Sequence, residues 1–240
     1  MVWLDGSDGD TVTADGDGKV SEWLSKGRSP YPFLQAIDSR KPEWGDATQN
    51  GLYVMDFVSA SLQANDTPAG EFADLHQGPA SGLVVWRIPG NATAFDNCGN
   101  ASLSNGFVFQ RTGHSSTSGQ GRHWARSSDA DIINASAGNY VPVDQWHVFH
   151  FLFDPENAVA AERSRIFING ANEISNNTYA GDWTTANPTS HPKLMGSSNN
   201  VNNNQTGRMA ELVLDDRLWS EAELEAAIEA LAEKWGITLP

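Results

Sequence analysis

Residues 146–174 constrain the fold more than any other part of the chain. The segment "WHVFHFLFD" alternates between two faces, and the three phenylalanines on one face mark that face as core. "SRIFINGANEI" follows, and its Asn169-Gly170 pair supplies the positive φ angles of a tight hairpin turn. This spacing predicts three successive antiparallel strands, so the fold must contain an antiparallel sheet with a buried face.

Other short apolar segments, separated by turns rich in glycine and asparagine, indicate further strands. They are "GLYVMDFV" at 51–58, "GLVVWRI" at 82–88, "GFVFQRT" at 106–112, "HWARSS" at 123–128 and "RMAELVLDDRLW" at 208–219.

Only the end of the chain is helical in pattern. Ser220 and Glu223 form a capping box and Gly236 is placed to end the helix, which predicts a helix at about 221–235. The face expected to pack on the sheet consists of Leu224, Ala227, Ile228, Leu231 and Trp235.

A chain of 240 residues without an internal repeat or a linker composition is expected to form one domain, residues 1–240. Its hydrophobic fraction of 39% and its nine tryptophans are sufficient for a substantial core. Cys98 is the single cysteine, so no intramolecular disulfide can form and packing must supply the stability. No Sec-type signal opens the sequence and no run approaches about 18 apolar residues, so membrane insertion is not expected.

The formal net charge of −15 comes from 30 acidic and 15 basic residues. Such a surface repels polyanions, so nucleic acid is not an expected partner. The excess of carboxylates favours solubility and can attract divalent cations. It is also typical of a solvated acidic face or of adaptation to a salty setting.

Three blocks of sequence resemble the laminin-G-like, or concanavalin A-like, domains of bacterial surface proteins and phage structural proteins. They are "VWLDGSDGDTVTADGDGKVSEW" at the start, "DQWHVFHFLFD…RIFING" in the centre and "GRMAELVLDDRLWSEAELEAAIEALAEKWGI" at the end. The resemblance implies an all-β, two-sheet antiparallel jelly-roll sandwich with one C-terminal α-helix. It also implies a domain that binds glycans, proteins or calcium and does no chemistry, although the fold alone does not fix function.

The same architecture hosts glucanases, so paired carboxylates are the enzymatic alternative. A retaining glycosidase needs two carboxylates about 5–5.5 Å apart in one cleft. On a strand, Glu71 and Asp74 would face opposite sides. Glu211 and Asp215 share a face, but their segment matches the family's non-catalytic last strand. The sequence therefore predicts a protein that is not an enzyme, with a glycoside hydrolase as the minor alternative.

The six histidines do not follow a metal-binding pattern. His147 and His150 stand three residues apart on a predicted strand, so they point to opposite faces. The sequence contains no HExxH motif and no Cys/His spacing typical of zinc.

A glycan site needs an exposed aromatic face beside amide or carboxylate groups that bind hydroxyls. The segments at 121–129, 181–188 and 197–206 offer these residue types. The predicted ligand-binding residues are Trp124, Trp183, Asn199, Asn200, Asn202, Asn203 and Asn204. The alternative is that Trp183 belongs to the core and that the asparagines are ordinary turn residues.

The stretch "DGSDGDTVTADGDGK" at 5–19 suggests a calcium loop, with Asp15 and Asp17 as candidate ligands. An EF-hand loop fails in both registers, because position 6 is Val20 or Asp10 instead of glycine. The Asp-Gly pairs suit a tight reversal between two strands. A structural turn is therefore expected, with a calcium site of another kind as the alternative.

The expected function is a non-catalytic surface-display or binding module, most simply a phage virion component for capsid decoration or attachment. Its partner would then be a capsid or tail protein and its location the virion. The alternative is a carbohydrate-binding module of a secreted bacterial adhesin, which binds a surface glycan at an extracellular surface.

Overall fold

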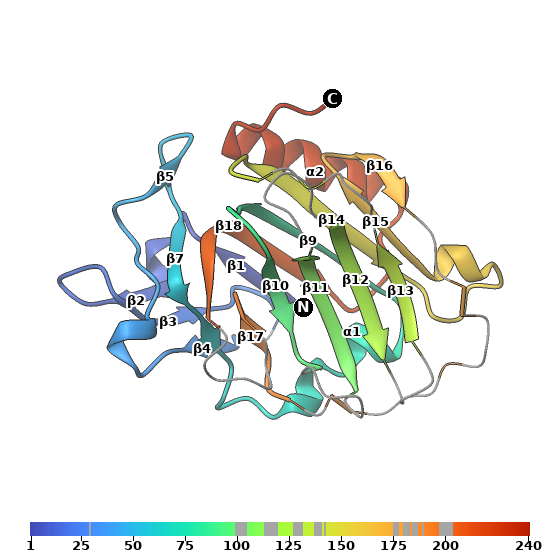
Figure 1. Cartoon of the computed structure of the whole chain (residues 1–240), viewed down its shortest axis with the longest axis horizontal. Helices are drawn as coiled ribbons and strands as arrows, with labels where there is room; N and C mark the ends of the chain where they lie inside the picture. The colour runs from blue at the N-terminus through green and yellow to red at the C-terminus, as the bar shows by residue number, and fades with distance from the viewer. Residues whose placement is uncertain are drawn as a thin grey trace.

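The structure is a computed structural model of the chain. It describes residues 1–28, 30–98, 105–112, 120–126, 132–136, 141, 143–174, 178–179, 183, 187–188, 190–196 and 204–240. Within these ranges the strands form two large antiparallel sheets that pack face to face, with one long helix near the end of the chain (Figure 1). This is the all-β sandwich with a C-terminal helix that the sequence predicts.

The first sheet has seven described strands in the order β1-β18-β9-β14-β15-β16, with β7 also paired to β18. They are β1 (Val2–Asp5), β7 (Met55–Ala60), β9 (Ala80–Arg87), β14 (His147–Phe153), β15 (Ser164–Ile168), β16 (Ala171–Ile174) and β18 (Gln205–Asp215).

The second sheet has nine described strands in the order β13-β12-β11-β10-β17-β8-β4-β3-β2. They are β2 (Val12–Ala14), β3 (Val20–Leu24), β4 (Pro32–Leu34), β8 (Leu62–Gln63), β10 (Ala92–Asp96), β11 (Gly106–Thr112), β12 (Gln120–Arg126), β13 (Ile132–Ser136) and β17 (Lys193–Leu194). A separate hairpin joins β5 (Thr48–Gln49) to β6 (Leu52–Tyr53).

The helices of the described ranges are α1 (Asp74–Gln77) and α2 (Glu221–Trp235). Short 3-10 turns are η1 (Gly9–Thr11), η2 (Asp38–Arg40), η3 (Ala69–Phe72) and η4 (Ala160–Arg163). In the part of the chain that the structure describes, no helix has the length and apolar character needed to span a bilayer.

Aromatic side chains fill the space between the two sheets. Phe149, Phe151 and Phe153 of β14 all belong to this core, as the alternation of the segment predicts. The rings of Phe109 and Trp86 both stack on Phe149, with centroid distances of 4.4 and 6.0 Å. Such contacts bury large apolar areas, which replaces the stability that disulfides would otherwise supply.

The outer face of the first sheet is buried as well, because α2 lies across it (Figure 1). This outer cluster consists of Leu83, Val85, Val148 and Leu152 from the sheet and Leu224, Ile228, Leu231 and Trp235 from the helix, with Trp219 and neighbouring residues. All seven residues of β14 are consequently buried. The helix face is the one that the sequence predicts.

The structure also confirms the predicted ends of α2 and the predicted turn between β15 and β16. The hydroxyl of Ser220 accepts from the backbone NH of Glu223, and the Glu223 carboxylate accepts from the backbone NH of Ser220. Gly236 ends the helix with a φ of 63°. Asn169 and Gly170 form the predicted hairpin turn, with φ angles of 52° and 75°.

Two predicted strands differ in extent. Residues 51–58 divide into β6 and the start of β7, because β6 pairs with β5 whereas β7 pairs with β18. The last strand ends at Asp215 and not at Trp219, since Trp219 folds back on the sheet. Its backbone NH donates to Ser81 Oγ at 2.9 Å and its indole NH donates to Asp215 Oδ2 at 2.8 Å.

A β-bulge in β18 determines which side chains face the helix. The register of β18 on β9 shifts between Met209 and Glu211, so Ala210 is the extra residue. Met209 and Leu212 belong to the core between the sheets, whereas Glu211 reaches the helix side and contacts α2. The bulge therefore brings a carboxylate beneath the helix.

A charged cluster joins β1, β18 and α2. Lys234 Nζ lies 2.9 Å from Asp5 Oδ1 and 2.7 Å from Glu211 Oε2. The indole NH groups of Trp3 and Trp235 donate to the Glu211 carboxylate at 2.7 and 2.9 Å. Asp5 and Glu211 are only 5% and 2% exposed. These donors compensate the two carboxylates for the water that they lose on folding.

The cluster keeps Asp5 charged in the folded protein. Burial by itself would raise the pKa of Asp5, but hydrogen bonds from Ser7 and Lys234 hold that pKa below its ordinary value. Lys26 adds a second ammonium group, 3.2 Å from Asp5 Oδ2. The stability that ionised Asp5 contributes is therefore present above the ordinary pKa of an aspartate, and it is lost as the pH falls through the lowered pKa.

Replacing Lys234 with methionine is expected to destabilise the protein by about 3 kcal/mol, because both buried carboxylates lose their shared ammonium group. Urea unfolding measures the change in free energy. The matched control is K19M, since Lys19 pairs with Glu43 at the surface and its loss is expected to cost less than about 1 kcal/mol. Equal losses in the two variants would contradict the role assigned to the cluster.

Candidate functional site

The residues that the sequence predicts as ligand-binding are only partly within the described structure. Trp124 lies in β12 and its side chain is outside the described residues. Asn199, Asn200, Asn202 and Asn203 are also outside them. Asn204 is described, and its side-chain oxygen accepts a hydrogen bond from Ser61 Oγ at 2.8 Å. Ligand binding by these residues stays a prediction.

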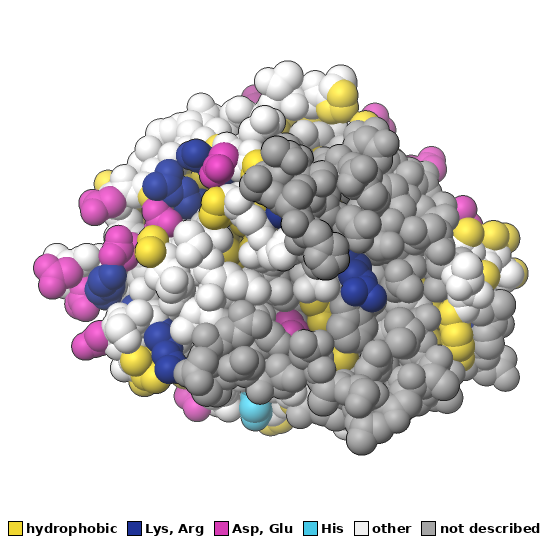
Figure 2. All heavy atoms as spheres, viewed as in Figure 1, with side chains coloured by type: hydrophobic (Ala, Val, Ile, Leu, Met, Phe, Trp, Pro, Cys, Tyr) yellow, Lys and Arg dark blue, Asp and Glu magenta, His cyan; other side chains and the backbone are white. Residues whose placement is uncertain are grey.

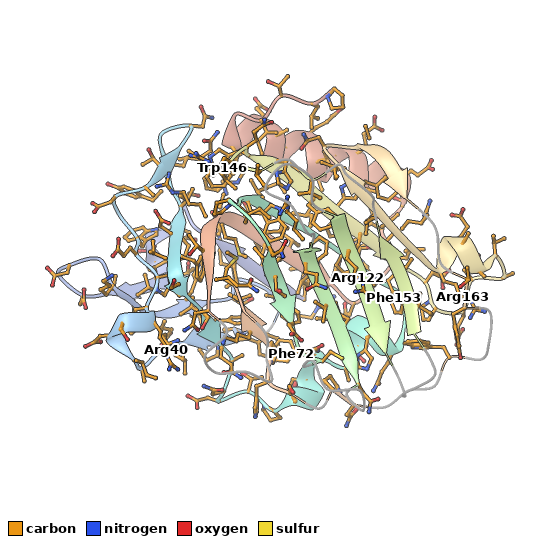
Figure 3. All side chains as sticks on the ribbon, viewed as in Figure 1. Arg40, Phe72, Arg122, Trp146, Phe153 and Arg163 are labelled. Carbon is orange, nitrogen blue, oxygen red and sulfur yellow. The ribbon has the colours of Figure 1, made fainter. Side chains whose placement is uncertain are left out.

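Trp183 is half-buried and packs against the core. Its indole NH donates to the backbone oxygen of His76 at 2.8 Å, and its ring meets Phe153 and Tyr179 edge-on at 5.9 and 6.1 Å. Phe153 is the last residue of β14, and Trp146 directly precedes the first residue of this strand, at its other end (Figure 3). These contacts agree with the packing alternative for Trp183, and its role toward a ligand stays a prediction.

The turn at 15–18 is the tight reversal that the Asp-Gly pairs predict. Asp15 Oδ1 accepts from the backbone NH groups of Asp17 and Lys19 at 3.0 and 2.9 Å. Gly18 has a φ of +76°, and a Cβ there would lie 2.7 Å from the backbone oxygen of Trp44, so glycine is required. Across the described ranges, no three His, Cys, Asp or Glu side chains are grouped to hold a metal ion. Calcium binding at Asp15 and Asp17 stays a prediction.

This turn lines an open cleft of about 560 Å³, which we call the Trp44 cleft. The lining residues are Val12, Ala14, Asp15, Gly16, Asp17, Gly18, Glu43, Trp44, Gly45, Asp46 and Tyr53. The backbone NH of Trp44 donates to Gly18 O at 2.9 Å and its indole NH donates to Gly6 O at 2.7 Å. Its ring meets Tyr53, which is 44% exposed, edge-on at 5.1 Å. Two aromatic rings are therefore held in place at the cleft.

Carboxylates surround this aromatic pair. Asp17 and Asp46 are exposed, whereas Glu43 pairs with Lys19. Acidic side chains gather at the same edge of the molecule, on the left in Figure 2, where Figure 1 shows the turn between β2 and β3. Carboxylate oxygens accept hydrogen bonds from hydroxyl groups, and aromatic rings pack against the apolar faces of sugars. The cleft can therefore bind a ligand rich in hydroxyl groups.

Trp44 and Tyr53 are not among the residues predicted from the sequence. Trp44 lies in the polar segment "PEWGDA" at 42–47, outside every alternating pattern, and this is the one signal that distinguishes it from a core tryptophan. Tyr53 lies inside a segment predicted as a single strand. The cleft exists because the fold brings the turn next to 43–46, through backbone pairing of Lys19 with Glu43.

The four carboxylates that could serve a glycoside hydrolase lie in two places, near α1 and on β18. Glu71 belongs to η3 and Asp74 begins α1. The prediction that the two would face opposite sides of a strand therefore does not apply to them. Glu211 and Asp215 do share a face of β18, under the outer cluster. Glu211 accepts hydrogen bonds within the charged cluster, and Asp215 accepts from the indole of Trp219. Both carboxylates contribute to packing at these positions.

Two buried histidines are held neutral. His123 Nδ1 lies 2.8 Å from Ser164 Oγ. His147 Nε2 accepts from the indole NH of Trp86 at 2.8 Å, which assigns the proton to Nδ1, 3.1 Å from Gln145 O. Burial lowers the pKa of His123 to about 3 and that of His147 to about 4. Neither ring carries charge at neutral pH.

No family model matches the chain, and no curated protein matches its sequence. The structure is similar to the binding domain of botulinum neurotoxin serotype C1, with a TM-score of 0.56 and 8% identity, covering 96% of this chain and 52% of that one. A structure of botulinum neurotoxin type C, whose cell entry depends on interaction with two ganglioside molecules, matches with a TM-score of 0.52 and 9% identity. The match covers 90% of this chain and 51% of that one.

The binding domain of botulinum neurotoxin DC in complex with rat synaptotagmin II gives a TM-score of 0.51 and 11% identity, covering 90% of this chain and 52% of that one. This chain thus spans about half the length of these solved chains. At such low identity the likeness shows the β-sandwich fold alone. The laminin-G-like assignment itself stays a prediction.

Replacing His123 with phenylalanine is expected to make stability less sensitive to acid. An unfolded histidine binds a proton near pH 6.5, whereas folded His123 stays neutral down to about pH 3. Between these two values the unfolded state binds one more proton than the folded state. The free energy of unfolding therefore falls by about 1.4 kcal/mol for each unit by which the pH is lowered. Urea unfolding from about pH 6 to about pH 4 measures the slope, which should be smaller in H123F by this amount.

The control is S164A, which removes the hydrogen-bond partner of His123 but keeps the imidazole. Its slope with pH should equal that of the wild type, even though its stability differs. If S164A changes the slope as much as H123F does, the titration of His123 is not the cause.

Proposed function

We propose that this chain is a non-catalytic binding module that holds a neutral glycan in the Trp44 cleft. The observation that carries the proposal is the pairing of two fixed aromatic rings with carboxylates at one open cleft. Its volume of about 560 Å³ is within the range of small-molecule sites, about 300–1,000 Å³. The rings pack on the faces of the sugar, and Asp17 and Asp46 accept hydrogen bonds from its hydroxyl groups.

The charge of the molecule favours uncharged sugars. The net charge is −15, and the cleft itself carries carboxylates, so the acidic groups of sialic or uronic acids are repelled. The likeness to binding domains, including one described with gangliosides, supports glycan recognition on this fold in general. The local charge then narrows the class to neutral glycans.

For the biological setting we propose the surface of a virion, with a capsid or tail protein as the partner that displays the module. The resemblance of the three sequence blocks to domains of phage structural proteins supports this setting. The same blocks resemble domains of bacterial surface proteins, so a secreted adhesin is the alternative setting. Both settings use the same cleft.

On a glycan array the protein is expected to bind neutral glycans and not their sialylated forms. Y53A removes the exposed ring and should weaken binding about tenfold. D17N/D46N replaces two carboxylates with neutral amides, which are weaker acceptors for hydroxyl groups, and should also weaken binding. D10N is the matched control, because Asp10 is exposed but does not line the cleft. Binding restricted to sialylated glycans, full binding by Y53A, or hydrolysis of a bound polysaccharide would contradict the proposal.

Mass spectrometry of fractions from the source organism tests the setting. Peptides of this chain are expected in purified virions, together with capsid and tail proteins. Their presence in the bacterial surface fraction, and not in particles, would assign the module to an adhesin. Neither result changes the test of the cleft itself.

A further inference from the structure

A second site lies on the outer face of the first sheet, between α2 and the β15–β16 hairpin. We call it the α2 groove; its volume is about 560 Å³ and it shares no residue with the Trp44 cleft. Its apolar lining includes Leu152, Phe167, Leu224, Ile228 and Leu239. A partly apolar groove of this volume can take several side chains of a ligand.

His150 lines this groove, and its ring is fully buried. Its side chain is 0% exposed, and its ring stacks on Phe167 with centroids 4.5 Å apart and 7° between the planes. Neither ring nitrogen has a hydrogen-bond partner among the described residues. Buried polar groups are nearly always hydrogen-bonded. Phenylalanine would give the same stack without this penalty, so packing does not account for the imidazole.

A row of carboxylates forms the helix side of the groove. Glu221, Glu225 and Glu229 line it, are exposed, and take part in no ion pair within the described ranges. Their spacing of four residues places them about 6 Å apart along the helix, over about 12 Å in all. Among described residues Arg165 is the one cation in the lining, and it lies 3.3 Å from Glu162, outside the groove. The groove therefore has an excess of negative charge.

We propose that the α2 groove binds a basic, amphipathic peptide segment of a partner protein. In an extended segment, side chains on one face recur about every 6.6–6.8 Å, close to the repeat of the glutamate row. Lysine side chains at alternate positions meet successive glutamates, and the apolar side chains between them cover the lining. Because His150 is fully buried in the free protein, side chains of the lining must shift on binding, and the peptide backbone, which carries both NH and C=O groups, then supplies the hydrogen bonds that His150 lacks.

The linear arrangement favours a peptide over a compact amine. A single ammonium group reaches one or two of the glutamates, whereas a row of about 12 Å requires a ligand with several cations in line. The stems of lysine side chains are apolar and can lie along Leu224 and Ile228 while their charged ends stay at the rim. The net charge of −15 adds attraction over a longer range.

The test is a titration of the whole chain into a labelled peptide in which lysine and leucine alternate, followed by fluorescence anisotropy at low salt. E221Q/E225Q/E229Q should bind about tenfold more weakly than the wild type. The matched control is D10N/D17N/D46N, which removes the same number of exposed carboxylates away from the groove and should bind like the wild type. Equal weakening in both variants would mean that overall charge alone attracts the peptide, which overturns the proposal.

H150F separates ligand binding from stability. It keeps the ring beside Phe167 but has no nitrogens, so its stability should equal or exceed that of the wild type while its peptide affinity falls about fivefold. A peptide with serine in place of leucine should bind poorly to the wild type. Unchanged affinity in H150F, or equal binding of the serine peptide, overturns the proposal.

The two binding sites can be judged separately. E221Q/E225Q/E229Q should keep the binding of neutral glycans, and D10N/D17N/D46N should keep the binding of the peptide. A failure of the peptide test alongside normal glycan binding rejects only the α2 groove.

Discussion

The ammonium group of Lys234, held between the buried carboxylates of Asp5 and Glu211, determines how the outer layer of this protein is placed. The three residues come from the first strand, the longest strand and the C-terminal helix. Two carboxylates taken out of water are costly unless donors surround them. Here the ammonium group and two indole NH groups do so, and Lys234 and Trp235 reach the carboxylates only when α2 lies across the sheet in one orientation.

The other features of that face follow from this placement. With α2 fixed, its apolar side chains cover the outer face of β9 and β14, so the middle of the first sheet is buried on both sides. The same orientation sets the row of glutamates beside the β15–β16 hairpin and so forms the α2 groove. At the other end of the chain, Asp5 also begins the loop that leads to the Trp44 cleft, where Gly6 O accepts the indole NH of Trp44.

Local patterns in the sequence predict the parts of the fold that depend on neighbouring residues. The Asn169-Gly170 turn, the Ser220 capping box and the core face of β14 are of this kind. Both binding sites depend instead on segments that are distant in sequence. Trp44 meets the 15–18 turn only through strand pairing, and His150 meets α2 only after the helix has docked. For Glu71 and Asp74, three residues apart, the spacing rules out a shared face only on a strand, and spacing does not distinguish a strand from a short helical turn.

Because of the bulge at Ala210, the alternation of side chains between the two faces of β18 shifts by one residue after Met209. If β18 kept all its residues but alternated regularly after Met209, Glu211 would point into the aromatic core and Leu212 would point toward the helix. An insertion or deletion on either side of the bulge would likewise turn side chains to the opposite face, whereas surface turns can lengthen at little cost. Any alignment of related chains should therefore run without gaps on either side of Ala210 within 205–215, and this strand, more than any loop motif, is the reference by which distant members of the fold can be numbered.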